Sequence, residues 1–147
     1  MSDGEEKNKI RIEHSIAAGD YLKAGGASND IKETLKMIGI PPNITRRAAI
    51  IAYEAEMNLV IHGGGGNIAA NIDDKQIEIV TTDHGPGIPD VALALQEGYT
   101  TANDNARSMG FGAGMGLPNI KRNSDVFNID SEVGKGTTLK AAIDITK

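Results

Sequence analysis

Residues 44–66 read ITRRAAIIAYEAEMNLVIHGGGG, and this stretch decides the fold because it is the longest periodic segment of the chain. A helix turns by about 100° per residue, so residues three and four apart share a face. On such a wheel the segment carries an apolar stripe, which predicts a helix packed on a core. The stripe consists of Ile44, Ala48, Ile51, Ala55 and Leu59. The helix is predicted to begin near Ile44, capped by Asn43 or Thr45, and to end at His62 before the glycines 63–66.

Three polar side chains, Glu54, Asn58 and His62, follow one edge of that stripe, whereas Glu56 is predicted on the solvent side. Polar groups on a core-facing edge cost free energy unless they are partnered, so we expect this edge to face a ligand or a polar network. A structural network is one alternative, since an imidazolium at His62 is favoured near a helix carboxyl end. The other is a magnesium nucleotide, because an amide oxygen suits the metal and a carboxylate can orient or deprotonate a hydroxyl.

Glycine is the one anomaly of the composition, with 18 residues that are clustered along the chain. Turns and helix caps explain some of them, but glycines at every second position of residues 110–116 (GFGAGMG) indicate close approach of the backbone to a ligand. A helix is predicted from Gly116 to about Asp125, and its free N–H groups suit phosphate. The spacing matches neither GxGxxG nor GxxxxGK[ST], which argues against Rossmann and P-loop sites.

A second candidate segment begins where the predicted strand 76–82 ends, at Asp83-His-Gly85-Pro-Gly87-Ile88. An acidic residue at this position can accept a hydrogen bond from an amino group, and the glycines allow a flat ring to pack on the backbone. This arrangement fits an adenine pocket. The alternative is an Asp at a loop entrance followed by a Pro-Gly turn, which is commoner in general.

The remaining segments predict an α+β protein, a two-layer sandwich in which a mixed, mostly antiparallel sheet has helices on one face. Ile10, Ile12 and Ile16 alternate with polar residues and predict a half-buried strand. Residues 28–30 would cap a helix that ends near Ile38. Further strands are predicted at 67–72, 126–132 and 137–145, with a short helix after Pro89 and a mobile polar loop at 99–112. Residues 1–9 read as a disordered tail and residues 10–147 as a single domain.

Length, charge and composition argue against several classes of protein. At 147 residues a chain buries roughly 70% of its extended surface and has a real core. The net charge of -5 argues against nucleic acid and membrane surfaces as partners. No apolar run approaches the roughly 20 residues that span a bilayer, and MSDGEEKNK lacks the apolar stretch of a signal peptide, so a cytoplasmic location is expected. The absence of cysteine and the scattered histidines give no sign of a disulfide framework or zinc cluster.

Four segments, in order along residues 54–138, resemble the nucleotide-binding boxes of the gyrase, Hsp90, histidine-kinase and MutL (GHKL) ATPase superfamily. They are Glu54-Ala-Glu-Met-Asn58 with His62, Asp83-His-Gly85-Pro-Gly87, Gly110-Phe-Gly112-Ala-Gly114-Met-Gly116, and Gly134-Lys-Gly136-Thr137-Thr138. Within the superfamily the chain is most similar to the bacterial anti-sigma regulatory serine/threonine kinases, in particular the stressosome switch kinases. That similarity is carried by IHGGGGNI, TTDHGPGIPDVALALQEGYTT, GMGLPNIKRNSDVF and DSEVGKGTT.

The resemblance implies a role for each matching residue. Glu54 would be the catalytic carboxylate, Asn58 the Mg2+ ligand, and Asp83 the partner of the adenine amino group. Gly87 would lie beneath the adenine ring, Thr138 would support the base through water, and residues 99–110 with Arg107 would form a lid. The glycines at 112, 114 and 116 would hold the phosphates. The nucleotide-binding positions implied also include His62, Gly85, Ile88, Thr101, Gly110, Met115 and Leu117, beside Gly112, Gly114 and Gly116.

Two functions are implied. The first is an ATP- and Mg2+-dependent kinase that phosphorylates a serine or threonine of a STAS-domain anti-sigma antagonist; the second is a nucleotide-dependent anti-sigma or switch protein with little or no phosphotransfer. Glu54 favours the first. A sigma factor or a PP2C-type phosphatase is a further candidate partner, and the protein is expected to be a monomer or a homodimer. Asn119 and Asn123 depart from the resemblance, which leads us to expect small or apolar residues there.

Overall fold

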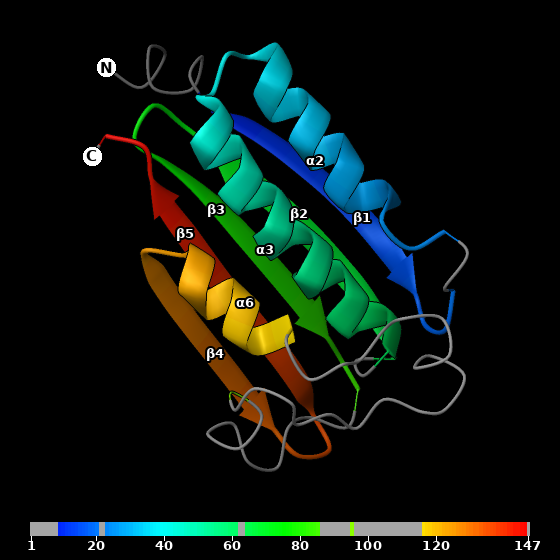
Figure 1. Cartoon of the computed structure of the whole chain (residues 1–147). Coiled ribbons are helices and arrows are strands. Elements are labelled where there is room, and N and C mark those ends of the chain that lie inside the picture. The colour runs from blue at the N-terminus through cyan, green and yellow to red at the C-terminus, as the bar shows by residue number, and fades with distance from the viewer. Residues whose placement is uncertain (1–8, 21–22, 62–63, 86–94, 96–115, 147) are drawn as a thin grey trace.

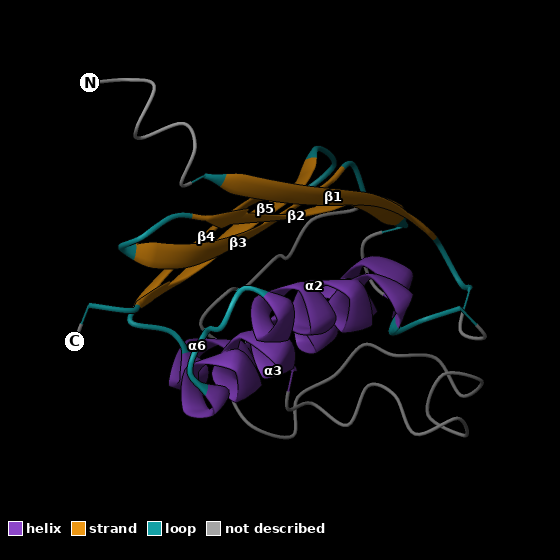
Figure 2. Ribbon diagram, turned by 90° about the horizontal axis from the view of Figure 1, so that it is seen from above, coloured by secondary structure: helices purple, strands orange, loops and turns teal. Residues whose placement is uncertain are grey.

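The computed structural model describes residues 9–20, 23–61, 64–85, 95 and 116–146, which form one sheet and a layer of helices (Figure 1). The strands in these residues are β1 (Ile10–Ala17), β2 (Gly65–Ile72), β3 (Gln76–Asp83), β4 (Val126–Glu132) and β5 (Gly136–Asp144). The helices are α2 (Gly26–Met37), α3 (Pro42–Ile61) and α6 (Gly116–Asn123). Figure 2 shows these helices on one face of the sheet, which confirms the predicted two-layer α+β sandwich.

The strand order is β1-β2-β3-β5-β4, and every pairing between described strands is antiparallel. We expected a mixed, mostly antiparallel sheet because the predicted strands and helices are interleaved while several strands follow one another as hairpins. The parallel pair is avoided because β5 turns back from β4 and inserts between β3 and β4. No helix among the described residues is long and apolar enough to cross a membrane.

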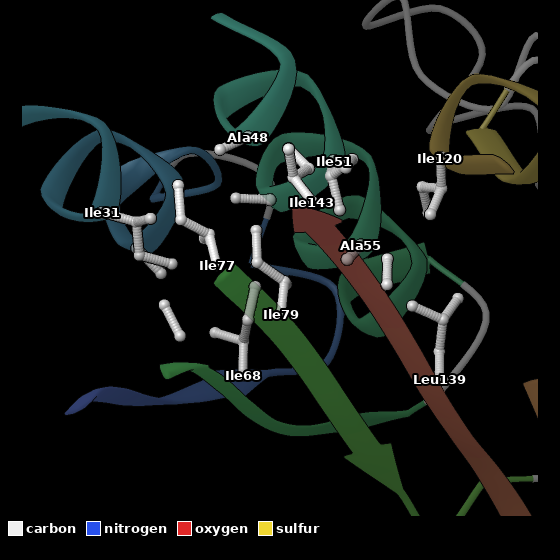
Figure 3. Close-up of a cluster of buried hydrophobic side chains, with 14 of the residues drawn as sticks. Ile31, Ala48, Ile51, Ala55, Ile68, Ile77, Ile79, Ile120, Leu139 and Ile143 are labelled. Atoms are coloured by element: carbon white, nitrogen blue, oxygen red, sulfur yellow. The ribbon is translucent and has the colours of Figure 1, made fainter. Parts of the chain in front are cut away.

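The core lies between the two layers, and its sequence pattern follows the predicted periods. The whole predicted stripe of α3 is buried, and β1 alternates half-buried and exposed residues along its length. Figure 3 shows Ile77 and Ile79 of β3 and Leu139 and Ile143 of β5 among these buried side chains. Burying one such side chain completely contributes about 1.5–3 kcal/mol of stability, so this shared core fixes how the helices lie on the sheet.

Several element boundaries differ from the prediction for local reasons. Helix α3 begins at Pro42 because a proline at the first helical position needs no N–H partner. Helix α2 begins at Gly26, and its N-cap is Gly25 in the left-handed region (φ 100°), with no side-chain cap from residues 28–30. Helix α6 ends at Asn123, two residues before the predicted end.

Two glycines allow neighbouring strands to close around the end of β3. A Cβ on Gly66 of β2 (φ 154°) would overlap the carbonyl oxygen of Thr82, and a Cβ on Gly136 of β5 (φ 120°) would overlap that of Asp83. The sequence assigned the glycines 63–66 only to the end of the preceding helix, yet Gly66 belongs to β2. Both glycines therefore help to place Asp83 at the edge of the core.

Candidate functional site

The polar edge of α3 faces the beginning of α6. A Cβ on Gly116, the first residue of α6, would lie 3.4 Å from Asn58 Oδ1 and 3.8 Å from Glu54 Oε1. The first turn of a helix has N–H groups without intrahelical partners and a positive dipole end. The structure thus brings a carboxylate and an amide oxygen next to a helix start, which supports the prediction that this edge faces a polar site.

Glu54 is held from α6 by a residue that the sequence did not assign to the site. Asn119 Nδ2 donates a hydrogen bond to Glu54 Oε2 at 2.8 Å, and Arg122 Nη1 donates to Asn119 Oδ1 at 2.9 Å. One carboxylate oxygen of Glu54 therefore has a neutral amide partner that is itself oriented by a guanidinium. The signal in the sequence was the polar residue at a position where the resemblance led us to expect a small or apolar one.

The prediction that Glu56 lies on the solvent side was wrong. Its side chain is 2% exposed, and its carboxylate accepts the backbone N–H groups of Gly25 (3.0 Å), Ala27 (3.3 Å) and Ser28 (2.9 Å). These N–H groups belong to the N-terminus of α2, so Glu56 takes the place of the missing side-chain cap. The reason is that α3 packs against α2 as well as against the sheet. The prediction from the helical wheel assumed a single buried face.

Tyr53 comes directly before Glu54 in the sequence and three residues before Glu56, and both carboxylates affect its hydroxyl. Burial raises the pKa of the Tyr53 hydroxyl above its usual value, and the negative charges of Glu54 and Glu56 raise it further. Tyr53 is nevertheless 40% exposed, so part of its apolar surface faces solvent.

At the other predicted half of the site, a row of polar side chains crosses the end of the sheet. Asp83 closes β3 on the same face as buried Ile79 and pairs in register with Thr137 of β5. Thr137 pairs in turn with Ser131 of β4, and their hydroxyl oxygens lie 2.7 Å apart. Asp83 Oδ1 accepts the backbone N–H of Gly85 at 2.9 Å, which shapes the chain as it leaves the strand.

Thr138, the predicted threonine of the adenine site, lies on the opposite face of the sheet from this row. Successive residues of a strand point to opposite faces, and Leu139 and Ala141, which share the face of Thr137, are buried under the helices. Thr138 pairs with Thr82, whose side chain alternates with that of Asp83 in the same way. The resemblance implied this role for Thr138 alone, whereas the strand register places Thr137 on the face of Asp83.

The other predicted site residues divide into two groups. Leu117 is buried in the core. Gly85 and Gly116 are the described residues that come before residue 86 and after residue 115. Figure 1 shows that α3 and β3 end, and α6 begins, at the same end of the molecule. The predicted short helix and lid lie outside the described residues. So do His62, Gly87, Ile88, Thr101, Gly110, Gly112, Gly114 and Met115.

Comparisons with known proteins agree with this arrangement. Residues 38–147 match the family model described as histidine kinase-, DNA gyrase B- and HSP90-like ATPase. The chain is 34% identical over 114 residues to the serine/threonine-protein kinase RsbT of Bacillus subtilis (strain 168), covering 75% of this chain and 80% of RsbT. It is 34% identical over 103 residues to the anti-sigma F factor of Geobacillus kaustophilus, covering 66% of this chain and 67% of that protein.

Solved structures share the fold at low sequence identity. A chain of the SiaB-SiaC complex from Pseudomonas aeruginosa has a TM-score of 0.64 at 14% identity, covering 97% of this chain and 95% of that one. The mycobacterial sensor histidine kinase MprB has a TM-score of 0.52 at 15% identity, covering 92% of this chain and 97% of that one. At such identities the likeness concerns the fold alone.

Proposed function

Since the chain belongs to the histidine kinase-, DNA gyrase B- and HSP90-like ATPase family, we propose that it is a Mg2+-dependent protein kinase that transfers the terminal phosphoryl group of ATP to a serine or threonine. We further propose that the acceptor is a STAS-domain protein of the anti-sigma antagonist type. The observation that carries the proposal is the position of Glu54 and Asn58 beside the first residue of α6. A carboxylate, an amide oxygen and a helix start are the groups that this chemistry needs.

The described residues fit a magnesium nucleotide. Asn58 and Glu54 offer hard oxygen atoms, and the absence of a side chain on Gly116 leaves space directly in front of them. Asn58 would hold the metal, Gly116 and the glycines before it would hold the phosphates, and Asp83 would accept the adenine amino group. When bound, Mg-ATP supplies the phosphoryl group and the neutralisation of its charge.

Glu54 would act on the acceptor hydroxyl. Its Oε2 accepts the Asn119 hydrogen bond, so Oε1, the oxygen nearer to Gly116, would orient the hydroxyl or take its proton. Asn119 would thereby limit rotation of the carboxylate. Near the adenine base, the proposal assigns Thr137 in place of Thr138, because Thr137 shares the face of Asp83.

The named functions of the relatives support two candidate functions that differ in what the chain does to its protein partner. RsbT is named as a serine/threonine-protein kinase and supports transfer to a hydroxyl of a protein. The anti-sigma F factors favour a second candidate function, in which the nucleotide controls the binding of a sigma factor or antagonist and transfer is minor. The presence of Glu54 beside the candidate phosphate site favours transfer.

Incubation of the chain with radiolabelled ATP, Mg2+ and each STAS-domain protein encoded near its gene tests the proposal. We expect label on a serine or threonine of one of these proteins. ATP binding without transfer to any of them would support the second candidate function instead.

A further inference from the structure

A groove of about 920 Å³ runs over the outer side of the helices, and its walls come from all three described helices. Its lining includes Lys32 and Lys36 of α2 and Ile50 and Tyr53 of α3. From α6 it includes Asn119, Arg122 and Asn123. Figure 2 shows the three helices on one face of the sheet, so that each has an outer side that faces away from it. Apart from Glu54, the described residues that are proposed to contact the nucleotide do not line the groove.

The groove ends at the proposed catalytic carboxylate. Glu54 and its partner Asn119 both line it. Glu54 therefore faces two neighbourhoods, with Gly116 on the side of the nucleotide and the groove on the outer side of α3. A chain segment lying in the groove would bring its own side chains to Glu54. A hydroxyl on the segment could then reach the terminal phosphate from the groove side, while the rest of the segment stays outside the nucleotide site.

The charge of the groove is opposite to that of the chain. Within the described residues its lining holds four basic side chains and one acidic one, whereas the whole chain has a net charge of -5. Lys32 and Arg46 form no ion pair with any described residue, and Arg46 is exposed. Fixed positive charges of this kind attract acidic groups and raise association rates.

The groove also offers apolar surface. Ile40 and Ile50 are partly exposed in its lining, and Tyr53 is 40% exposed. Two further large apolar residues, Met37 and Ile38, follow lining residue Lys36 in sequence and are 84% and 43% exposed. Exposed apolar groups that are rimmed by charges are typical of protein interaction sites.

We propose that this groove docks an acidic, partly apolar segment of the phosphoacceptor protein and presents that protein's hydroxyl to Glu54. The inference rests on the proposed function and adds the surface that selects the acceptor. Charge complementarity identifies the occupant, since a negatively charged segment would pair with Lys32 and Arg46 while its apolar side chains cover Ile50 and Tyr53.

Charge reversal tests the docking in a transfer assay. The double variant Lys32→Glu/Arg46→Glu should raise the KM for the STAS-domain acceptor about tenfold, as expected when two docking charges are reversed, and should leave kcat and the KM for ATP unchanged. The matched control, Lys75→Glu/Lys140→Glu, makes the same change in net charge at exposed positions of the sheet layer. Equal KM values in the two double variants would overturn the proposal.

A binding measurement tests the groove without any transfer. We expect a serine-containing peptide rich in glutamate and leucine to shift the amide NMR signals of Lys32, Ala49 and Tyr53, and added salt to weaken the shifts. A matched peptide with lysine in place of glutamate should leave them unchanged. Identical responses to both peptides, or shifts elsewhere, would refute the docking site.

The two measurements keep failure of the docking site separate from failure of the kinase proposal. If no STAS-domain protein is phosphorylated, the kinase proposal fails, and the peptide titration still tests whether the groove binds an acidic segment. If transfer occurs but the charge-reversed groove behaves as the control does, the kinase proposal stands and the groove does not. If the groove variant changes the sedimentation of the chain instead of the acceptor KM, the occupant is a second copy of the chain and the proposal is wrong.

Discussion

Asn119 of α6 donates a hydrogen bond to Glu54 of α3, with 2.8 Å between Nδ2 and Oε2. The contact joins two residues that are 65 positions apart, and it connects the helix that follows the glycine run to the proposed catalytic carboxylate. The phosphate side and the acceptor side of the proposed site are therefore mechanically linked through one side chain.

The first prediction concerns that link. Asn119→Ala should lower kcat for phosphotransfer about tenfold with little change in ATP affinity, because a hydrogen bond to a charged group contributes about 1.5–3 kcal/mol and here it acts on orientation. Steady-state kinetics with calorimetric ATP binding measure the two effects. Asn123→Ala is the control, since Asn123 lies on the same helix and bonds to a backbone oxygen only in the described contacts. Equal losses in the two variants would argue against a role through Glu54.

The second prediction separates Glu56 from Glu54. Glu56→Ala should lower the free energy of unfolding by about 3 kcal/mol, because three backbone N–H groups at the start of α2 lose their charged acceptor. Urea denaturation measures the change. Glu33→Ala, which removes an exposed carboxylate of α2, should change stability by less than about 0.5 kcal/mol. A Glu56→Ala variant as stable as the control would restore the solvent-facing interpretation.

The third prediction distinguishes the two threonines of the last box. Thr137→Val should weaken binding of a non-hydrolysable ATP analogue with Mg2+ about fivefold, corresponding to the loss of one neutral hydrogen bond of about 1 kcal/mol. Thr138→Val should have no such effect, because Thr138 lies on the other face of β5. Calorimetry on both variants gives the comparison. A larger loss in Thr138→Val would mean that strand alternation does not decide the contact.

The fourth prediction concerns the placement of Asp83. Gly136→Ala should destabilise the fold by more than about 1–2 kcal/mol, since its Cβ would overlap the Asp83 carbonyl oxygen in addition to the backbone strain. Gly134→Ala is a matched control, because Gly134 also has positive φ (82°) but no atom within 4 Å of the added Cβ. Thermal denaturation should rank Gly136→Ala below Gly134→Ala, and the reverse order would contradict the close approach.

The periodic segments made most of the fold predictable. The apolar stripe of α3 and the alternation in β1 and β5 each reflect one buried face. The spacing of apolar residues in the sequence is sufficient to predict such a face. The burial of Glu56 was not predicted because it depends on a second helix, α2, whose N-terminal N–H groups need a hydrogen-bond acceptor. The sequence of α3 alone contains no pattern that indicates this contact.

Parts of the candidate site that lie within the described residues were foreseeable from the sequence, and others were not. Residue type and order brought Glu54 and Asn58 together with Gly116, as the structure places them. The register that separates Thr137 from Thr138 is a property of the paired strands, and sequence spacing alone does not contain it. Asn119 was visible only as a departure from the resemblance, and its contact with Glu54 required the packing of α6 on α3.

In the proposed function, Glu54 activates a protein hydroxyl for phosphoryl transfer. Transfer of label from ATP to a purified STAS-domain protein, compared between the wild-type chain and Glu54→Gln, tests it most directly, with calorimetric ATP affinity measured on both. Glutamine keeps the shape and the Asn119 contact but removes the base, so we expect similar ATP affinity and a loss of transfer of about 100-fold or more. Transfer by Glu54→Gln at the wild-type rate would show that Glu54 does not activate the acceptor hydroxyl.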